Sequence, residues 1–277
     1  MKKYFDAILY IVAFLLIQFA VTYAVVAVWA MAEGKSAGAA LSALTREGSP
    51  TIPQLIVIQV VSSVITLALF LMARWSRVSR SYLRSKPYGV LFWAAVAVIG
   101  TIIPSEVFIE LVPLPDFSGK TLADIMGNRW GYLVVCIFAP VVEELVFRGA
   151  VLRVLLQGTT RHWGAIALSA ALFALAHANP AQVPHAFCLG LLLGWMYYRT
   201  GSVIPGIMTH WVNNTVAYVV YNVFPQYADA KIIDLYGGNM LKVSLAVAIS
   251  LCSILLPAIV QLNLRMKKTE PENKNLV

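Results

Sequence analysis

The chain has few charged residues. Only 12% of its 277 residues are Asp, Glu, Lys or Arg, and 60% are hydrophobic, whereas a soluble domain carries about 25% charged residues. So little charge excludes an ordinary soluble domain and predicts a protein that crosses the lipid bilayer several times. The net charge of +8 is read by position between apolar segments and does not indicate a nucleic-acid partner.

Cysteine is scarce as well. Cys136, Cys188 and Cys252 lie far apart in apolar segments and form no CxxC pair. This spacing argues against a disulfide framework and against a zinc site built from thiolates. We expect the three cysteines to be small buried hydrophobic residues.

Long apolar segments dominate the sequence. A membrane-spanning helix needs about 20 mostly apolar residues. The expected spans cover residues 7–32, 52–73, 88–111, 130–152, 163–178, 184–199, 202–224 and 240–263. The predicted fold class is an all-α membrane protein, a bundle of eight transmembrane helices that forms one polytopic domain over residues 1–266. A polar cytoplasmic tail is expected over residues 267–277.

The basic residues predict the orientation. If the N-terminus is cytoplasmic, fourteen basic residues fall on its side of the membrane and six on the other, with Arg148 inside a span. Basic residues favour the cytoplasmic side, so both termini are expected in the cytoplasm. The outer connections 33–51, 112–129 and 225–239 are expected to be irregular.

Three ionisable residues lie inside the fourth apolar segment. Glu143 and Glu144 are adjacent, and Arg148 follows one helical turn later. A charge near the bilayer centre costs at least about 2.5–3.5 kcal/mol, so such residues indicate a functional site. Residues four apart share a helix face, so Glu144 is expected to pair with Arg148. Glu143, about 100° away on the helix, then faces the reaction centre, whereas a purely structural Glu–Arg pair would leave it without a partner.

Two histidines are the candidate partners of Glu143. His177 ends the fifth segment, and His210 lies inside the seventh. Asn214 shares a helix face with His210 because the two are four residues apart, and Asn213 is a rival for the same role. A buried imidazole and a buried amide need hydrogen-bond partners, and a carboxylate on a neighbouring helix can supply one.

The remaining histidines are weaker candidates. His162 is interpreted as a residue at the level of the lipid headgroups, and His185 as one near the outer surface. Counting residues from the inner ends places His177 near the outer surface, His210 in the inner half of its span and Glu143 near the middle. Tilted or unevenly inserted helices would bring these three together.

The combination of groups suits hydrolysis. Glu143 can act as a general base toward water, and a histidine with an asparagine can donate hydrogen bonds to an oxyanion. Alternatively, Glu143, His177 and His210 supply three ligands of a catalytic zinc ion. The residues leave both versions open.

Two other classes of function use the same residues. A proton-coupled transporter or channel would relay protons through Glu143, Glu144 and the histidines, but the sequence has no inverted repeat. A catalytically silent immunity or scaffold protein would keep the fold without needing Glu143.

The candidate residues form three ordered motifs. These are Glu143-Glu144-x-x-x-Arg148, Phe173-x-x-x-His177 and His210-x-x-x-Asn214. Over about residues 125–225, they resemble the motifs of the CAAX prenyl endopeptidase and bacteriocin-processing (Abi) family of intramembrane proteases.

This resemblance implies an eight-helix bundle with a water-accessible polar cavity between the motif-bearing helices. It also implies that Glu143 activates water, that His177 positions that water, and that His210 and Asn214 form an oxyanion hole. The expected substrate is a membrane-associated or lipidated peptide. Family members have been described as zinc-dependent and as metal-independent, so a zinc cofactor stays open.

Overall fold

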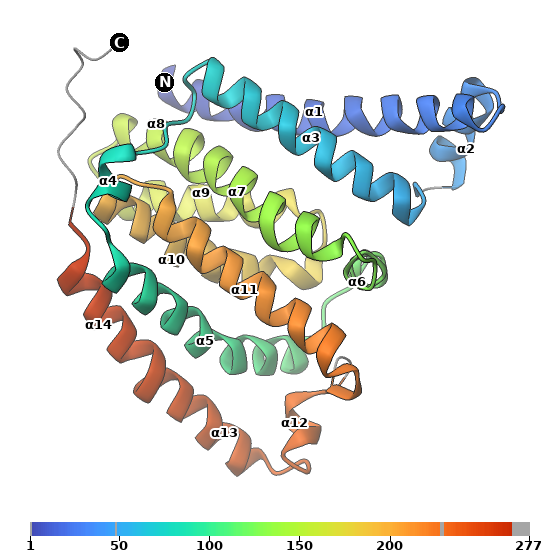
Figure 1. Cartoon of the computed structure of the whole chain (residues 1–277). Helices are drawn as coiled ribbons and strands as arrows, with labels where there is room; N and C mark the ends of the chain where they lie inside the picture. The colour runs from blue at the N-terminus through green and yellow to red at the C-terminus, as the bar shows by residue number, and fades with distance from the viewer. Residues whose placement is uncertain (1, 48, 228–229, 268–277) are drawn as a thin grey trace.

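The computed structural model describes residues 2–47, 49–227 and 230–267, and these residues form an all-helical structure (Figure 1). The tail that the sequence predicts over residues 267–277 lies outside the described residues, apart from Lys267. The fold class is therefore confirmed as all-α.

In the described part of the chain, each of the eight apolar segments coincides with a helix or a continuous helical rod. These are α1 (Lys2–Ala32), α3 (Ile52–Met72), α5 (Tyr88–Leu111), the rod η1 (Tyr132–Phe138), α7 (Ala139–Glu144), η2 (Leu145–Leu152) and α8 (Arg153–Gly158), then α9 (His162–Ala176), α10 (Val183–Thr200), α11 (Ile204–Val223), and the rod α13 (Met240–Ile249), η5 (Ser250–Leu255) and α14 (Leu256–Arg265).

Four of the described helices are long and apolar enough to cross a membrane: α1, α3, α5 and the rod from Met240 to Arg265. Helix α9 is apolar but shorter. The chain is therefore a multi-pass integral membrane protein. That all eight rods span the bilayer stays a prediction.

The outer connections contain short helices, so the prediction of irregular structure is wrong there. They are α2 (Ala37–Glu47), α6 (Gly119–Met126) and α12 (Ile232–Leu235). Helix α2 is rich in alanine, the strongest helix former. The Asp116 carboxylate accepts the backbone N–H of Gly119 at 2.8 Å, and Glu110 accepts the N–H of Ile233 at 3.1 Å. These carboxylates satisfy N–H groups that a helix start leaves without partners.

The other short elements lie at the ends of the bundle. They are α4 (Arg80–Arg84), η3 (Pro180–Gln182) and η4 (Pro225–Tyr227). Figure 1 shows α1 and α3 along one edge and α5 and α14 along the other, with the motif-bearing helices between them. Helix α9 packs along α10, and α11 contacts α5, α10 and the rod that contains α7.

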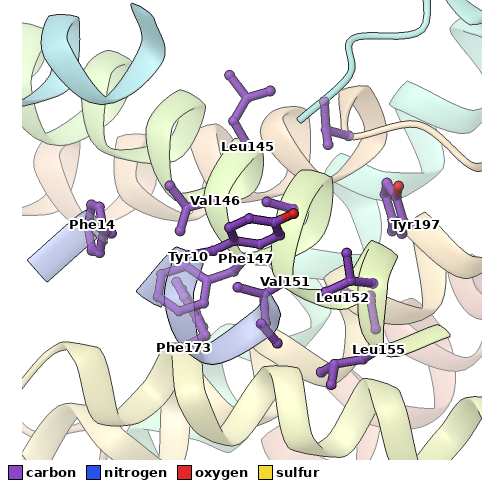
Figure 2. Packing of buried hydrophobic residues seen from close by; sticks show 14 of the residues in the cluster. Tyr10, Phe14, Leu145, Val146, Phe147, Val151, Leu152, Leu155, Phe173 and Tyr197 are labelled. Atoms are coloured by element: carbon purple, nitrogen blue, oxygen red, sulfur yellow. The ribbon is translucent and has the colours of Figure 1, made fainter. Parts of the chain in front are cut away.

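The largest buried cluster surrounds η2, so the residues next to the glutamates lie at the centre of the molecule (Figure 2). The Phe147 ring makes edge-to-face contacts with Phe14 of α1 at 5.9 Å and with Phe173 of α9 at 5.3 Å between ring centroids. Such pairs are worth about 0.5–1.5 kcal/mol beyond their buried area. They hold three helices in fixed positions around the candidate site.

The expectation for the cysteines is correct only in part. Cys136 is buried, whereas Cys188 and Cys252 are exposed on helix surfaces. In a membrane protein the outward faces contact lipid and are also apolar. An apolar setting in the sequence therefore does not distinguish a buried cysteine from one that faces lipid.

Candidate active site

The rod that carries the glutamates contains two π-helical segments, η1 and η2, on either side of α7. Short π-helical segments occur frequently at functional sites. Carbonyl groups of η2 receive side chains from elsewhere: Ser76 donates to the oxygen of Leu145, and Ser169 donates to that of Phe147 at 3.0 Å. The irregular backbone is therefore held in place by neighbouring segments.

Pro140 frees one carbonyl group in this rod. The N–H of Ala139 donates to the oxygen of Val134, five residues earlier. The next bond of this π pattern would join residue 140 to the oxygen of Val135, but a proline has no N–H. The Val135 oxygen instead accepts a hydrogen bond from Asn214 Nδ2 of α11 at 2.9 Å.

Glu144 forms a fully buried ion pair with Arg148. Arg148 Nη1 lies 2.7 Å from Glu144 Oε1, and both side chains are at most 1% exposed. Arg148 also donates to the carbonyl oxygen of Gly190 at 3.3 Å and stacks over the Phe173 ring, with its Cζ 4.3 Å from the centroid. The predicted pairing is confirmed, and the pair joins the glutamate rod to α9 and α10.

His210 lies between the two glutamates. Its Nε2 is 3.8 Å from Glu143 Oε2, and its Nδ1 is 3.5 Å from Glu144 Oε1. The Glu143 side chain is 22% exposed, whereas that of His210 is only 5% exposed. Because Arg148 pairs with Glu144, His210 is the only basic side chain within 4 Å of the Glu143 carboxylate among the described residues.

Gly206 permits the close approach of α11 to Glu144. A Cβ atom at this position would lie 2.5 Å from Glu144 Oε2, well inside van der Waals contact. Gly206 lies one turn before His210, so the absence of a side chain there brings His210 up to both carboxylates.

His177 and His210 both contact the ring of Phe173. Their ring centroids lie 5.0 Å and 5.8 Å from that of Phe173, each in an edge-to-face arrangement. Counting residues along the helices predicts that His177 and His210 lie at different depths in the membrane, but both histidines contact the same ring. Phe173 lies one turn before His177, and it reaches His210 because α9 packs on η2 while α11 packs on the adjoining α7.

The protonation of His177 follows from its hydrogen bond. Its Nδ1 lies 3.0 Å from the carbonyl oxygen of Phe173, and a carbonyl can only accept. Nδ1 therefore carries the hydrogen, and in the neutral ring Nε2 keeps a lone pair. His177 can accept a hydrogen bond from water through that nitrogen.

Asn213 and Asn214 belong to one chain of hydrogen bonds, and His185 joins it. Asn213 Nδ2 donates to Asn214 Oδ1 at 3.1 Å, and Asn213 Oδ1 lies 3.2 Å from His185 Nε2. Asn214, which shares the face of His210, also contacts η1 through the Val135 oxygen, and the choice between the two asparagines stays a prediction. His185 was a weak candidate from the sequence, and its signal there was an ionisable group within an apolar segment.

The turn after His177 is tied to the connection that precedes α6. The buried Asn179 donates from Nδ2 to Asp116 Oδ1 at 2.9 Å, and its Oδ1 accepts the N–H of Phe117 at 3.0 Å. The hydrogen bond from Asn179 lowers the pKa of Asp116 below its usual value, so this tie persists into acidic solution. Sequence reasoning missed Asn179, although an asparagine before a proline favours a turn.

His162 lies away from the candidate site. It stacks on Tyr198 with 4.3 Å between ring centroids and 3° between ring planes. Helix α9 begins at His162 and has 15 residues, which puts His162 about 22 Å from His177 at 1.5 Å per residue. This placement agrees with the expected position near one end of the bundle.

The described residues do not form a metal site. No group of three His, Cys, Asp or Glu side chains converges on a point that could hold a metal ion in that part of the chain. Glu143 and His210 face each other. The hydrogen bond from His177 Nδ1 to a backbone oxygen leaves its Nε2 open, which is also how a metal-binding histidine is held. In the described residues, however, Glu143, His177 and His210 do not converge as a zinc ligand set.

Comparison with known proteins gives one match. Residues 126–216 match the family described as type II CAAX prenyl endopeptidase Rce1-like. No curated protein and no solved structure was found to match the chain. The matched range contains all three motifs and agrees with the range of about 125–225 over which the sequence resembles this family. The chain therefore carries, over residues 126–216, a domain of the Rce1-like CAAX prenyl endopeptidase family, which is a family of proteases.

Proposed function

We propose that the protein is an intramembrane endopeptidase that hydrolyses peptide bonds in membrane-associated or lipidated peptides. One observation carries the proposal. Glu143, the more exposed of the two glutamates, faces His210 at 3.8 Å, while Arg148 balances the buried Glu144. A carboxylate with no cation of its own, beside a histidine, suits a general base.

The reaction begins with water held between Glu143 and His177. Glu143 takes one proton from this water, and the hydroxide that remains attacks the peptide carbonyl carbon. The second hydrogen stays on the oxygen and donates a hydrogen bond to His177 Nε2. His210 and the second N–H of Asn214 Nδ2 donate to the oxyanion that forms. Glu143 then gives its proton to the leaving nitrogen, and the C–N bond breaks.

No step of this mechanism passes through a metal. In the described residues, Glu143, His177 and His210 do not converge as a zinc ligand set, and the Glu143 carboxylate accounts for both proton transfers. Glu144 and Arg148 hold the glutamate rod and do not touch the reacting atoms.

We also propose the protein's setting. The start of α1 and the end of α14 lie at the same end of the bundle (Figure 1), which supports a chain with both termini in the cytoplasm. The substrate partner is then a peptide that reaches the site from the bilayer, and the membrane is a bacterial cytoplasmic membrane.

The test uses the purified protein in detergent with two sets of peptides. The sets have the same sequences, but a cysteine near the C-terminus of each peptide is prenylated in one set and unmodified in the other. Glu143→Gln keeps the size of the side chain and removes the base, so we expect hydrolysis to fall about 10²–10⁴-fold. His162→Ala is the matched control because His162 lies outside the site, and it should retain wild-type turnover. Mass spectrometry of the fragments identifies the cut bond.

Two results would contradict the proposal. Equal turnover in wild type and Glu143→Gln would remove Glu143 from catalysis. Proton flux into liposomes that is lost in Glu143→Gln, without any peptide cleavage by wild type, would instead support a transporter.

A further inference from the structure

The bond to one backbone oxygen shows which way the Asn214 side chain is turned. The freed Val135 carbonyl can only accept a hydrogen bond, so the atom 2.9 Å from it must be the amide nitrogen of Asn214. The amide oxygen of Asn214 then faces Asn213, which must present its own nitrogen to it at 3.1 Å. Each partner thus determines the orientation of the next.

The same reasoning extends to His185. With its nitrogen turned to Asn214, Asn213 presents its oxygen to His185 Nε2 at 3.2 Å. An amide oxygen only accepts, so His185 must carry a hydrogen on Nε2. The chain runs from His185 of α10 through Asn213 and Asn214 of α11 to Val135 of η1, and every donor in it points toward η1.

His185 also lies close to the residues of the candidate site. It is near enough to His177 and His210 to interact with both electrostatically. The second residue of α10 is Pro184, and His185 follows it in the first turn. A donor at this point of α10 can reach the middle of α11, with which α10 is in contact.

We propose that His185 is a positioning residue for the Asn214 amide. The inference rests on the proposed function, in which Asn214 donates its second N–H to the oxyanion. If the Asn214 amide turned over, its oxygen would face the oxyanion and repel it. The donor from His185 holds Asn213, and Asn213 in turn holds the oxygen of Asn214 away from the substrate.

The experiment compares two substitutions at one position. His185→Phe keeps a ring but removes the N–H, and His185→Gln keeps an N–H donor. We expect His185→Phe to lower kcat about 10- to 100-fold, less than the about 10²–10³-fold cost of losing an oxyanion donor. KM should change little, because the interaction is made in the transition state. His185→Gln should restore most of kcat.

A double variant tests the chain itself. Asn213→Ala and His185→Phe should each lower kcat, and the double variant should be no slower than Asn213→Ala alone, because the two residues act through one connection. His162→Phe is the control for loss of a histidine ring nitrogen outside the site, and it should cleave like wild type.

The outcomes separate this inference from the proposed function. Two results would show that His185 is not a positioning residue while the protease assignment stands. In the first, Glu143→Gln is inactive but His185→Phe has the kcat of wild type. In the second, His185→Gln is as slow as His185→Phe. If wild type cleaves neither peptide set, ¹⁵N NMR of labelled histidines decides. The Nε2 signal of His185 should be that of a protonated nitrogen in wild type and should shift in Asn213→Ala, and an unchanged signal would refute the hydrogen bond.

Discussion

At the scale of single residues, the candidate site is a problem of charge balance inside an apolar bundle. Glu143 and Glu144 bring two negative charges, and Arg148 supplies one positive charge within hydrogen-bonding distance. That arginine goes to Glu144, the carboxylate that is 0% exposed. This division leaves Glu143 beside His210, where we propose that it acts as the general base, and pairs Glu144 with the arginine.

The first prediction concerns the buried ion pair. Arg148→Met removes the cation and leaves the Glu144 carboxylate without compensation, so we expect a loss of about 3–5 kcal/mol in the free energy of unfolding. The double variant Arg148→Met with Glu144→Gln removes both charges and should recover part of that loss. Denaturant unfolding in detergent measures both. A double variant that is no more stable than Arg148→Met would argue against this ion pair.

The sequence predicted the pair but not the full site, for a physical reason. Glu144 and Arg148 are four residues apart, and helix geometry alone makes them neighbours. The bond from Asn214 to the Val135 oxygen depends on a contact between residues 79 positions apart and on a carbonyl that Pro140 leaves free. Helix periodicity contains no information about this long-range contact or about the free carbonyl. The role that we propose for His185, which acts through Asn214, could therefore not be predicted.

At the scale of elements, the close contact of α9 and α10 positions Arg148. Gly190 and Gly194 of α10 face Ala170 and Ile166 of α9, one helical turn apart on each helix. A Cβ atom on Gly190 would lie 2.9 Å from Ala170 Cβ, and one on Gly194 would lie 2.9 Å from Ile166 Cγ2. Small residues at such contacts let helices pack closely within membranes.

The second prediction tests this contact. Gly190→Ala forces α10 away from α9, because the new methyl group also meets the backbone Cα of Ala170 at 3.0 Å. We expect a loss of about 1–3 kcal/mol of stability, as for other overpacked contacts. The shift also moves the Gly190 oxygen away from Arg148, so turnover should fall along with the unfolding temperature.

Gly164→Ala is the matched control on α9. The nearest atom to an added Cβ there is 4.0 Å away, so the methyl group is accommodated. Alanine favours a helix over glycine by about 1 kcal/mol, and this variant should be as stable as wild type or more so. If Gly190→Ala unfolds at the same temperature as Gly164→Ala, the close contact does not limit stability.

At the scale of the whole molecule, the sequence predicted the helices well but not their faces. All eight apolar segments coincide with helices because a stretch of about 20 apolar residues has few alternatives in lipid. The buried face of each helix could not be predicted in the same way. Helix α1, for example, exposes Phe5, Leu16 and Phe19, which are as apolar as the residues it buries.

Different connecting segments and helix ends lie at the two ends of the bundle. At one end, a Cβ on Gly158 would lie 3.1 Å from Lys3, and Arg199 donates to the backbone oxygen of Asn263 at 2.8 Å. Figure 1 places the start of α1, α8 and the end of α14 together at this end, and α2, α6 and α12 at the other. Of the described basic residues that the sequence assigns to the cytoplasm, Lys3, Arg199 and Arg265 lie at this first end.

The last prediction follows from this arrangement. After the three native cysteines are replaced by serine, Thr160→Cys places a thiol between α8 and α9, and Ser42→Cys places one on α2. Both positions are exposed. In intact cells a membrane-impermeant maleimide should label Ser42→Cys at once and Thr160→Cys only after permeabilisation, because the excess of positive charge predicts a cytoplasmic α8 end.

The two thiols also test the number of spans. Thr160 follows the rod from Tyr132 to Gly158, so the side of the membrane on which it lies depends on whether this rod crosses the bilayer. This rod is not among the four described helices that have the length and hydropathy expected of a span. Labelling of both thiols from the same side would mean that the number of crossings between them is even. Three crossings separate the two thiols if α3, α5 and the glutamate rod all span the bilayer. Labelling from opposite sides would therefore support a candidate site within the bilayer. Labelling from the same side would contradict that placement of the site.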